Sequence, residues 1–131
     1  MRTKPCLEQA DVQTIVAACR AEASRHGWKI TIAVVDDGGY PLYLERMDGV
    51  KVTTVEVALG KARTAALSWL PSSKLENLIK DRPSILKLRS LPMQGGMPIL
   101  NEGQCVGGVG VAGADFHEDE QVAEAGAAAL G

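Results

Sequence analysis

Hydrophobic and polar positions follow two different periods along this chain, and each change of period marks a new element. Apolar residues recur near a 3.6-residue period over Cys6–His26, which predicts an amphipathic helix that ends at Gly27. Trp28–Val35 is rich in β-branched residues and alternates only at its start, as expected for a strand covered on both faces. After an Asp-Asp-Gly-Gly turn, Tyr40–Arg46 predicts a second strand that forms an antiparallel hairpin with the first.

The middle of the chain predicts two further helices and a weakly patterned connection. Thr53–Ser68 carries a face of small residues that can lie flat on a sheet, and Gly60 within it is tolerated if a neighbour packs closely there. A short helix is expected over Lys74–Lys80, started by the Ser-Ser pair after Pro71. From Asp81 to Met93 the pattern is weak, so we expect an irregular connection that serves as a lid or a subunit contact.

A glycine-rich stretch predicts a second hairpin, with strands over Met97–Leu100 and Gln104–Ala112 and a turn that ends at Gly103. Alternation along the longer strand divides it into two faces, one with Cys105, Gly107, Val109 and Val111 and the other with Val106, Gly108, Gly110 and Ala112. The second face is nearly bare of side chains. It indicates either close packing by a helix or a groove for a flat ligand.

The chain closes with a predicted helix and, taken as a whole, favours one domain. Asp115 is a candidate N-cap, and the acidic residues after it favour the first turn of a helix whose remainder is small and apolar. The two hairpins can join into one antiparallel sheet with helices on its faces. We therefore expect an α+β fold in a single domain that spans residues 1–131.

The composition limits the classes of binding partner that we expect for this chain. The net charge of −2 and an aromatic content of 4% give no electrostatic or stacking case for nucleic acid or an anionic membrane. No apolar run approaches the ~20 residues of a membrane-spanning helix. The three cysteines are widely spaced and no secretory signal is visible, so we expect reduced thiols and a cytoplasmic location.

Candidate chemistry is sparse. There is no Gly-x-Ser-x-Gly motif, and the two histidines lack metal-ligand spacing, so we expect neither a nucleophile triad nor a metal site. His117 lies beside carboxylates, and two interpretations are open: it is a metal ligand, or it is an exposed residue next to a helix cap. Lys61 is either solvated or a partner for a ligand carboxylate. Polar residues at element ends that can line a pocket are Asp36, Asp37, Tyr40, Glu45, Arg46, Lys61, His117 and Glu118.

Five segments, in order, carry a resemblance to a known family: AVVDDGGYPLYLERMDG, GKARTAALS, QGGMPI, GQCVGGVGVAG and DEQVAEAGAAAL. Together they resemble the GlcG/HbpS-like family, whose relatives include the C-terminal domain of PduO-type proteins. The resemblance implies a profilin-like layered domain, with an antiparallel sheet flanked by helices, and it implies homo-oligomers. Some members bind haem, and a similar class of protein acts as a lyase on hydroxylaminobenzoate, releasing ammonia to give a dihydroxybenzoate.

The first hypothesis is a protein that binds haem or another planar small molecule near the glycine-rich strand. Its expected ligand-binding residues are Tyr40, Arg46, Lys61, Gly95, Gly96, Gly108 and Gly110. Tyr40 stands where the family pattern often has histidine, and a tyrosinate can bind ferric iron. His26 and His117 are the remaining nitrogen donors.

The alternative hypothesis is a lyase that acts on a small aromatic acid. Arg46 or Lys61 would hold the carboxylate of the substrate, because arginine and lysine match that charge. Glu45 or His117 would be the catalytic residue that moves protons.

Overall fold

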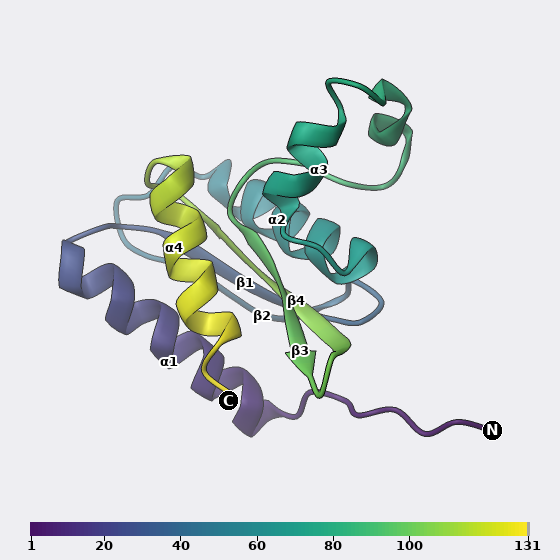
Figure 1. Ribbon diagram of the computed structural model, residues 1–131. Coiled ribbons are helices and arrows are strands. Elements are labelled where there is room, and N and C mark those ends of the chain that lie inside the picture. The colour runs from purple at the N-terminus through teal and green to yellow at the C-terminus, as the bar shows by residue number, and fades with distance from the viewer. Residues whose placement is uncertain (131) are drawn as a thin grey trace.

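A four-stranded antiparallel sheet with helices on both faces forms the body of the molecule (Figure 1), in a computed structural model that describes residues 1–130. The strands are β1 (Thr31–Asp36), β2 (Pro41–Arg46), β3 (Gly96–Asn101) and β4 (Gln104–Ala112), in the order β2-β1-β4-β3. The helices are α1 (Gln9–His26), α2 (Thr54–Ser68), α3 (Ser72–Leu78), the 3₁₀ helix η1 (Pro83–Lys87) and α4 (Phe116–Ala127). The predicted α+β fold, an antiparallel sheet flanked by helices, is confirmed.

The two predicted hairpins meet through their inner strands. β1 and β4 pair in antiparallel register from Thr31 opposite Ala112 to Asp36 opposite Gly107. β4 has the bounds that the alternation predicts, whereas α1 begins three residues later than predicted. The reason is a capping box, in which the side chains of Glu8 and Asp11 each accept a hydrogen bond from the other's backbone N–H.

One face of the sheet packs against α1 and α4 through large aliphatic side chains. Val109 and Val111 of β4 belong to a buried cluster with residues of β1, α1 and α4. The two helices also touch each other closely, because a Cβ atom at Gly126 of α4 would lie 2.4 Å from the Sγ atom of Cys19. In residues 1–130, no helix combines the length and the apolarity that a membrane span requires.

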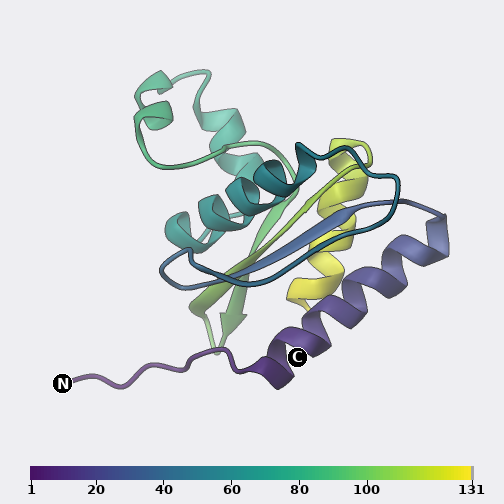
Figure 2. The ribbon, with the colours of Figure 1, turned by 180° about the vertical axis from the view of Figure 1, so that it is seen from behind.

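The other face packs against α2 through small side chains and, at two glycines, directly through the backbone; Figure 2 shows this helix lying over the sheet and running roughly along the strands. A Cβ atom at Gly108 would lie 2.2 Å from the carbonyl oxygen of Ala62, and one at Gly110 would lie 2.1 Å from that of Ala58. Helix packing, rather than a ligand groove, therefore explains this bare face. Within α2, Gly60 lies against Leu91, whose Cβ would be 2.7 Å from an added Cβ, so the expected close neighbour is present.

The predicted assignment of faces along β4 is wrong at its first residues. Cys105 hydrogen-bonds the carbonyl oxygen of Ala66 in α2, and Val106 belongs to the cluster under α1 and α4. The pairing with β3 slips between Ile99 and Leu100, so β4 holds one residue more than its partner at this point. Such a bulge exchanges the faces of the residues before it.

Candidate functional site

A pocket of about 510 Å³ lies where the end of β4, the first half of α2 and the start of α4 meet. Its volume is in the range typical of small-molecule sites. The residues that line it are Lys29, Gly49, Val50, Lys51, Thr53, Thr54, Val57, Lys61, Met93, Ala112, Gly113, Ala114, Phe116 and Asp119. They come from four separate stretches of the chain, so the pocket exists only in the folded molecule.

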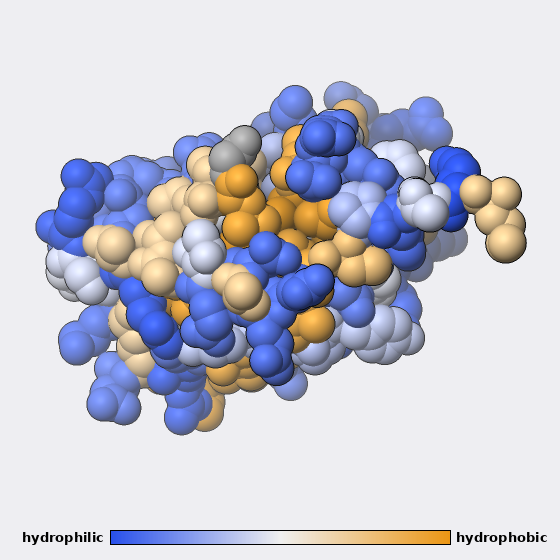
Figure 3. Space-filling model, turned by 90° about the horizontal axis from the view of Figure 1, so that it is seen from below, coloured by the Kyte–Doolittle hydropathy of each residue, from blue (hydrophilic) through white to orange (hydrophobic). Residues whose placement is uncertain are grey.

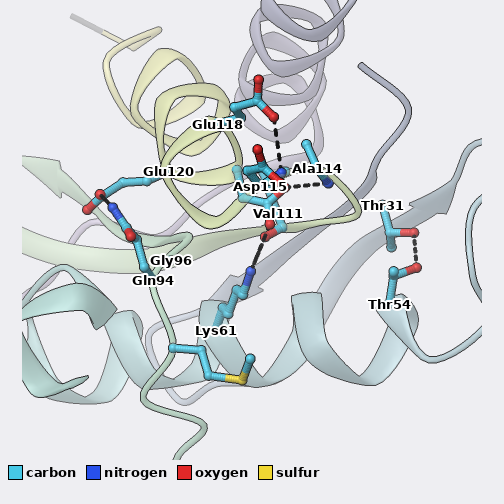
Figure 4. Close-up of polar contacts among 12 residues, drawn as sticks. Thr31, Thr54, Lys61, Gln94, Gly96, Val111, Ala114, Asp115, Glu118 and Glu120 are labelled. Carbon is cyan, nitrogen blue, oxygen red and sulfur yellow. Dashed lines mark hydrogen bonds and ion pairs between the residues drawn. The ribbon is translucent and has the colours of Figure 1, made fainter.

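A buried ion pair forms one wall of this pocket. The Nζ atom of Lys61 donates a hydrogen bond to the carbonyl oxygen of Val111 at 2.8 Å (Figure 4). It donates a second one to Asp119 at 3.1 Å. Both charged side chains are almost completely buried. Because Lys61 belongs to α2 and Asp119 to α4, the pair connects the helices on opposite faces of the sheet.

The third hydrogen of the Lys61 ammonium group is available for another acceptor. An ammonium group donates three hydrogen bonds, and two are used by Val111 and Asp119. The centroid of the Phe116 ring lies 5.2 Å from Nζ, which is within cation–π distance. Phe116 is 48% exposed, whereas Lys61 is fully buried.

Two glycines at the start of β3 leave room for Lys61, Gly95 beside its side chain and Gly96 beside its backbone. Gly95 has a φ of +127°, and a Cβ atom there would lie 2.7 Å from the Nζ atom of Lys61. A Cβ atom at Gly96 would lie 2.2 Å from the Lys61 carbonyl oxygen. Ser72 fixes this segment, because its Oγ accepts a hydrogen bond from Gly96 N at 2.8 Å and donates one to Met93 O. The structure thus places Gly95 and Gly96 against Lys61, but neither glycine lines the pocket, so close packing accounts for both and their predicted ligand-binding role stays a prediction.

Burial shifts both members of the ion pair toward their neutral forms. Desolvation lowers the pKa of the Lys61 amine, and the negative charge of Asp119 opposes this effect. Desolvation likewise raises the pKa of the Asp119 carboxyl group, and the charge of Lys61 opposes it. Burial therefore narrows the difference between the pKa values of these two groups.

The pocket carries an excess of positive charge. Lys29 and Lys51 are exposed and line it together with Lys61, whereas Asp119 is its one acidic lining residue. Val57 and Phe116 add apolar and aromatic surface. This combination suits an anionic ligand with a flat apolar part.

Three other predicted ligand or catalytic residues lie outside the pocket. Tyr40 is 70% exposed in the turn after β1, whereas the pocket lies beyond the start of that strand. Six residues of strand separate the two by about 17–20 Å, which is too far for Tyr40 to contact the same small ligand. Arg46 ends β2 opposite Thr31, near the pocket but outside its lining. His117 follows Phe116 and is exposed.

Glu45, predicted to move protons, is engaged elsewhere. Its carboxylate accepts hydrogen bonds from the guanidinium group of Arg20 and from the hydroxyl group of Tyr43, which links β2 to α1. The hydrogen bond from Arg20 lowers the pKa of Glu45. A carboxylate held this way is a poor proton acceptor, so the structure argues against the catalytic role predicted for it.

The carboxylates beside His117 cap a helix. Ligand atoms of Asp115, His117 and Glu118 lie within 4.8 Å of one another. However, the Asp115 side chain accepts a hydrogen bond from the Glu118 backbone, and the Glu118 side chain accepts one from Asp115 N at 3.1 Å. This capping box accounts for the cluster without a metal ion.

Sequence reasoning missed Asp119, Phe116, Lys29 and Lys51. A signal for Asp119 exists, because it precedes Val122, Ala123 and Gly126 by three, four and seven residues and so lies on the buried face of α4. An acidic residue on an apolar helix face indicates a buried partner. The two exposed lysines carry no comparable signal.

Comparison with known proteins gives a consistent result. The family model described as "Haem degrading protein HbpS-like" matches residues 7–128. Protein GlcG of Escherichia coli strain K12 is 38% identical over 113 residues, which are 85% of this chain and 84% of GlcG.

Solved structures agree with this match. A crystal structure of a double mutant of HbpS from Streptomyces reticuli superimposes with a TM-score of 0.93 at 33% identity, covering 100% of this chain and 91% of that one. The crystal structure of a PduOC–haem complex superimposes with a TM-score of 0.86 over 95% of both chains. Its 22% identity shows a shared fold.

Proposed function

Because the chain belongs to the HbpS-like family, we propose that it binds a small planar anion, with haem as the first candidate, in the pocket beside the Lys61–Asp119 ion pair. The observation that carries the proposal is that three lysines and one aromatic ring line the same pocket. The family description names haem degradation, and one protein of the same fold is a haem complex. Both support haem as the ligand to test first.

The side chains around the pocket fit haem, with one change from the sequence-based hypothesis. Lys29 and Lys51 are placed to pair with its two carboxylates, and Phe116 offers a face for its ring. Among the lining residues, Met93 carries the one thioether, a group that binds haem iron in other proteins. We therefore name Met93, in place of Tyr40, as the residue that would hold the iron. Bound haem would supply an iron centre for redox chemistry or gas binding.

Titration of the purified protein with haemin, followed by absorbance, tests the proposal. We expect a saturable change in the Soret band at one haem per chain. Lys51→Glu should weaken binding at least about tenfold, because it reverses a charge that faces the carboxylates. Met93→Leu should change the shape of the spectrum more than the affinity.

Two control variants make the titration specific. Lys74→Glu introduces the same charge change at an exposed position of α3 outside the pocket, and Tyr40→Phe removes the hydroxyl group at the far end of the sheet. Both should bind haemin like the original chain. Equal weakening by Lys51→Glu and Lys74→Glu, or loss of the Soret change in Tyr40→Phe, would contradict the proposed pocket.

A lyase acting on a small aromatic acid is the second candidate function. It is supported by the presence, in one pocket, of cations for a carboxylate, a ring for stacking and an ion pair that can exchange a proton. On this proposal the proton is moved by Asp119 rather than by Glu45 or His117. Ammonia release from hydroxylaminobenzoate should then disappear in Asp119→Asn and persist in Glu45→Gln. The opposite pattern would contradict the assignment.

We also propose that the chain forms homo-oligomers in the cytoplasm. Leu42 and Leu44 on the edge strand β2 are each more than 40% exposed, and an edge strand offers unpaired backbone groups. Figure 3 shows further apolar surface in the middle of the face seen from below. The free thiol of the exposed Cys6 supports a reducing compartment. Light scattering should give a mass above that of one chain, reduced by Leu44→Lys.

A further inference from the structure

We propose that Lys61 captures a small 2-oxo acid covalently as an imine, with Asp119 relaying the protons. The proposal rests on the pocket described above and adds a second class of ligand to it. It concerns the amine of Lys61 as a nucleophile, whereas noncovalent binding uses only the charges and the ring.

The surroundings of Lys61 are those of a reactive lysine. An amine becomes nucleophilic when a desolvated site favours its neutral form and a nearby group takes its proton. Lys61 is completely buried and lies 3.1 Å from Asp119, whereas the other six lysines of the chain are exposed. Burial also lowers the pKa of this amine. Lys61 is thus set apart from every other lysine by its environment.

The approach to the amine is guarded by one side chain. The Phe116 ring lies 5.2 Å from Nζ and is half exposed, so rotation of this ring opens a path from the pocket to the amine. A Cβ atom at Gly95 would lie 2.7 Å from Nζ, so the glycine leaves room beside the amine. In this proposal a carbonyl group reaches the amine from the pocket, past Phe116.

The exposed cations define the class of carbonyl compound. Lys29 and Lys51 line the same pocket and can hold a carboxylate while the neighbouring carbonyl carbon points toward Lys61. A 2-oxo acid carries these two groups on adjacent carbons. A simple aldehyde or ketone lacks the carboxylate and should react more weakly.

The chemistry balances with the groups present. The Lys61 ammonium gives one proton to the Asp119 carboxylate, and the free amine attacks the carbonyl carbon to form a C–N bond. Asp119 returns this proton to the former carbonyl oxygen, giving a carbinolamine. A second proton passes from nitrogen through Asp119 to the hydroxyl group, the C–O bond breaks, and water leaves. The product is a protonated imine, and the Asp119 carboxylate is regenerated.

Trapping with sodium borohydride in the presence of pyruvate tests the proposal on the full chain. Borohydride reduces the C=N bond to a stable secondary amine that mass spectrometry detects. We expect one adduct per chain, saturable with pyruvate, on the peptide that contains Lys61. Phe116→Ala should form it at least about fivefold faster, whereas Lys74→Arg, which alters an exposed lysine outside the pocket, should form it at the original rate.

Lys61→Arg keeps the positive charge but has no primary amine that forms an imine, so this variant should lose the adduct. Peptide mapping of the unaltered chain locates the adduct even if that variant does not fold. Adducts spread over the exposed lysines, or none on Lys61, would overturn this inference. If haemin binds as proposed but pyruvate is not trapped, imine capture alone is wrong. If pocket variants leave haemin binding unchanged, the proposed function is wrong whatever the trapping result.

Discussion

The two faces of the sheet differ in the size of the side chains that pack on them: large on the face covered by α1 and α4, small on the face covered by α2. Under α1 and α4, large residues such as Ile32, Val34 and Val109 fill the space between sheet and helices. Under α2, Gly108 and Gly110 of the sheet pack against the helix, whose facing residues are Ala58, Ala62 and Ala66. On the first face side chains separate the backbones, whereas on the second the backbones are in contact.

This difference predicts how each face responds to change. Large side chains can change rotamer and partly fill a cavity. Truncating one side chain on the first face should therefore lower the free energy of unfolding only moderately. A backbone contact has no side chain to move, so any added atom must displace the helix or the strand. The charged groups of the pocket lie at the edge of the second, stiffer face, where Lys61 passes from α2 toward α4.

The sharpest test of the comparison is Gly110→Val. Its added Cβ atom would lie 2.1 Å from the carbonyl oxygen of Ala58, so α2 must leave the sheet. We expect the free energy of unfolding to fall by at least about 4 kcal/mol, an effect reserved for severe disruption of a core. Urea unfolding followed by circular dichroism measures it. A loss below about 1 kcal/mol would show that the backbones are not in contact.

The next largest effect is expected from Lys61→Met, which leaves Asp119 buried without its partner. Removing one member of a buried ion pair costs about 3–5 kcal/mol. The double variant Lys61→Met, Asp119→Leu should recover most of this loss, because two apolar side chains of similar size need no charge compensation. A double variant less stable than Lys61→Met would contradict this explanation.

The same variant should show a characteristic pH dependence. Without Lys61, burial raises the pKa of Asp119 further above its unfolded value of about 3.9, so the folded state binds the proton more tightly than the unfolded state. Stability of the variant, relative to the original chain, should therefore fall as the pH rises above about 4. Unfolding at pH 4 and pH 7 should show the smaller deficit at pH 4. An equal deficit at both values would exclude an ionised Asp119 as its cause.

Val109→Ala probes the other face and should cost about 2 kcal/mol, because it leaves a small cavity under α1 and α4. The measurement is the same urea unfolding used for Gly110→Val. We expect the free energy of unfolding to fall clearly less in Val109→Ala than in Gly110→Val. The comparison fails if the two variants are equally unstable.

The smallest effect is expected from Glu45→Gln, at the margin of the first face. Glu45 and Arg20 are partly exposed, and such ion pairs contribute at most about 1 kcal/mol. Because Arg20 lowers the pKa of Glu45 in the folded state, this contribution is present above the unfolded pKa of about 4.3 and disappears as the pH falls below it. The variant should match the original chain at low pH. A persistent difference there would point to packing instead.

The elements were predictable because their signals are local. Gly103 and the alternation after it define β4, and Asp115 with Glu118 marks the start of α4. The bulge at Val106 could not be predicted, because the extra residue is defined only by the pairing of β4 with β3. Local patterns thus predict elements and their order but not their register.

The pocket was predicted only in part. Lys61, three residues after Ala58 and four before Ala65, lies on the buried face of α2, which favours a role for its charge. Which acid pairs with it could not be read from the sequence, since Asp119 is 58 positions away. Gly108 and Gly110 were misleading as groove residues, because a glycine face looks the same whether a helix or a ligand covers it.

The Lys61–Asp119 contact also has a consequence for biosynthesis. The ribosome synthesises the chain from the N-terminus to the C-terminus, so helix α2 emerges before α4 does. Until α4 docks, Lys61 has no carboxylate partner and the pocket lacks Phe116. A ligand that needs both can be taken up only after the last helix is in place. Ligand uptake would therefore report, on a newly made chain, that α4 has been synthesised and has docked.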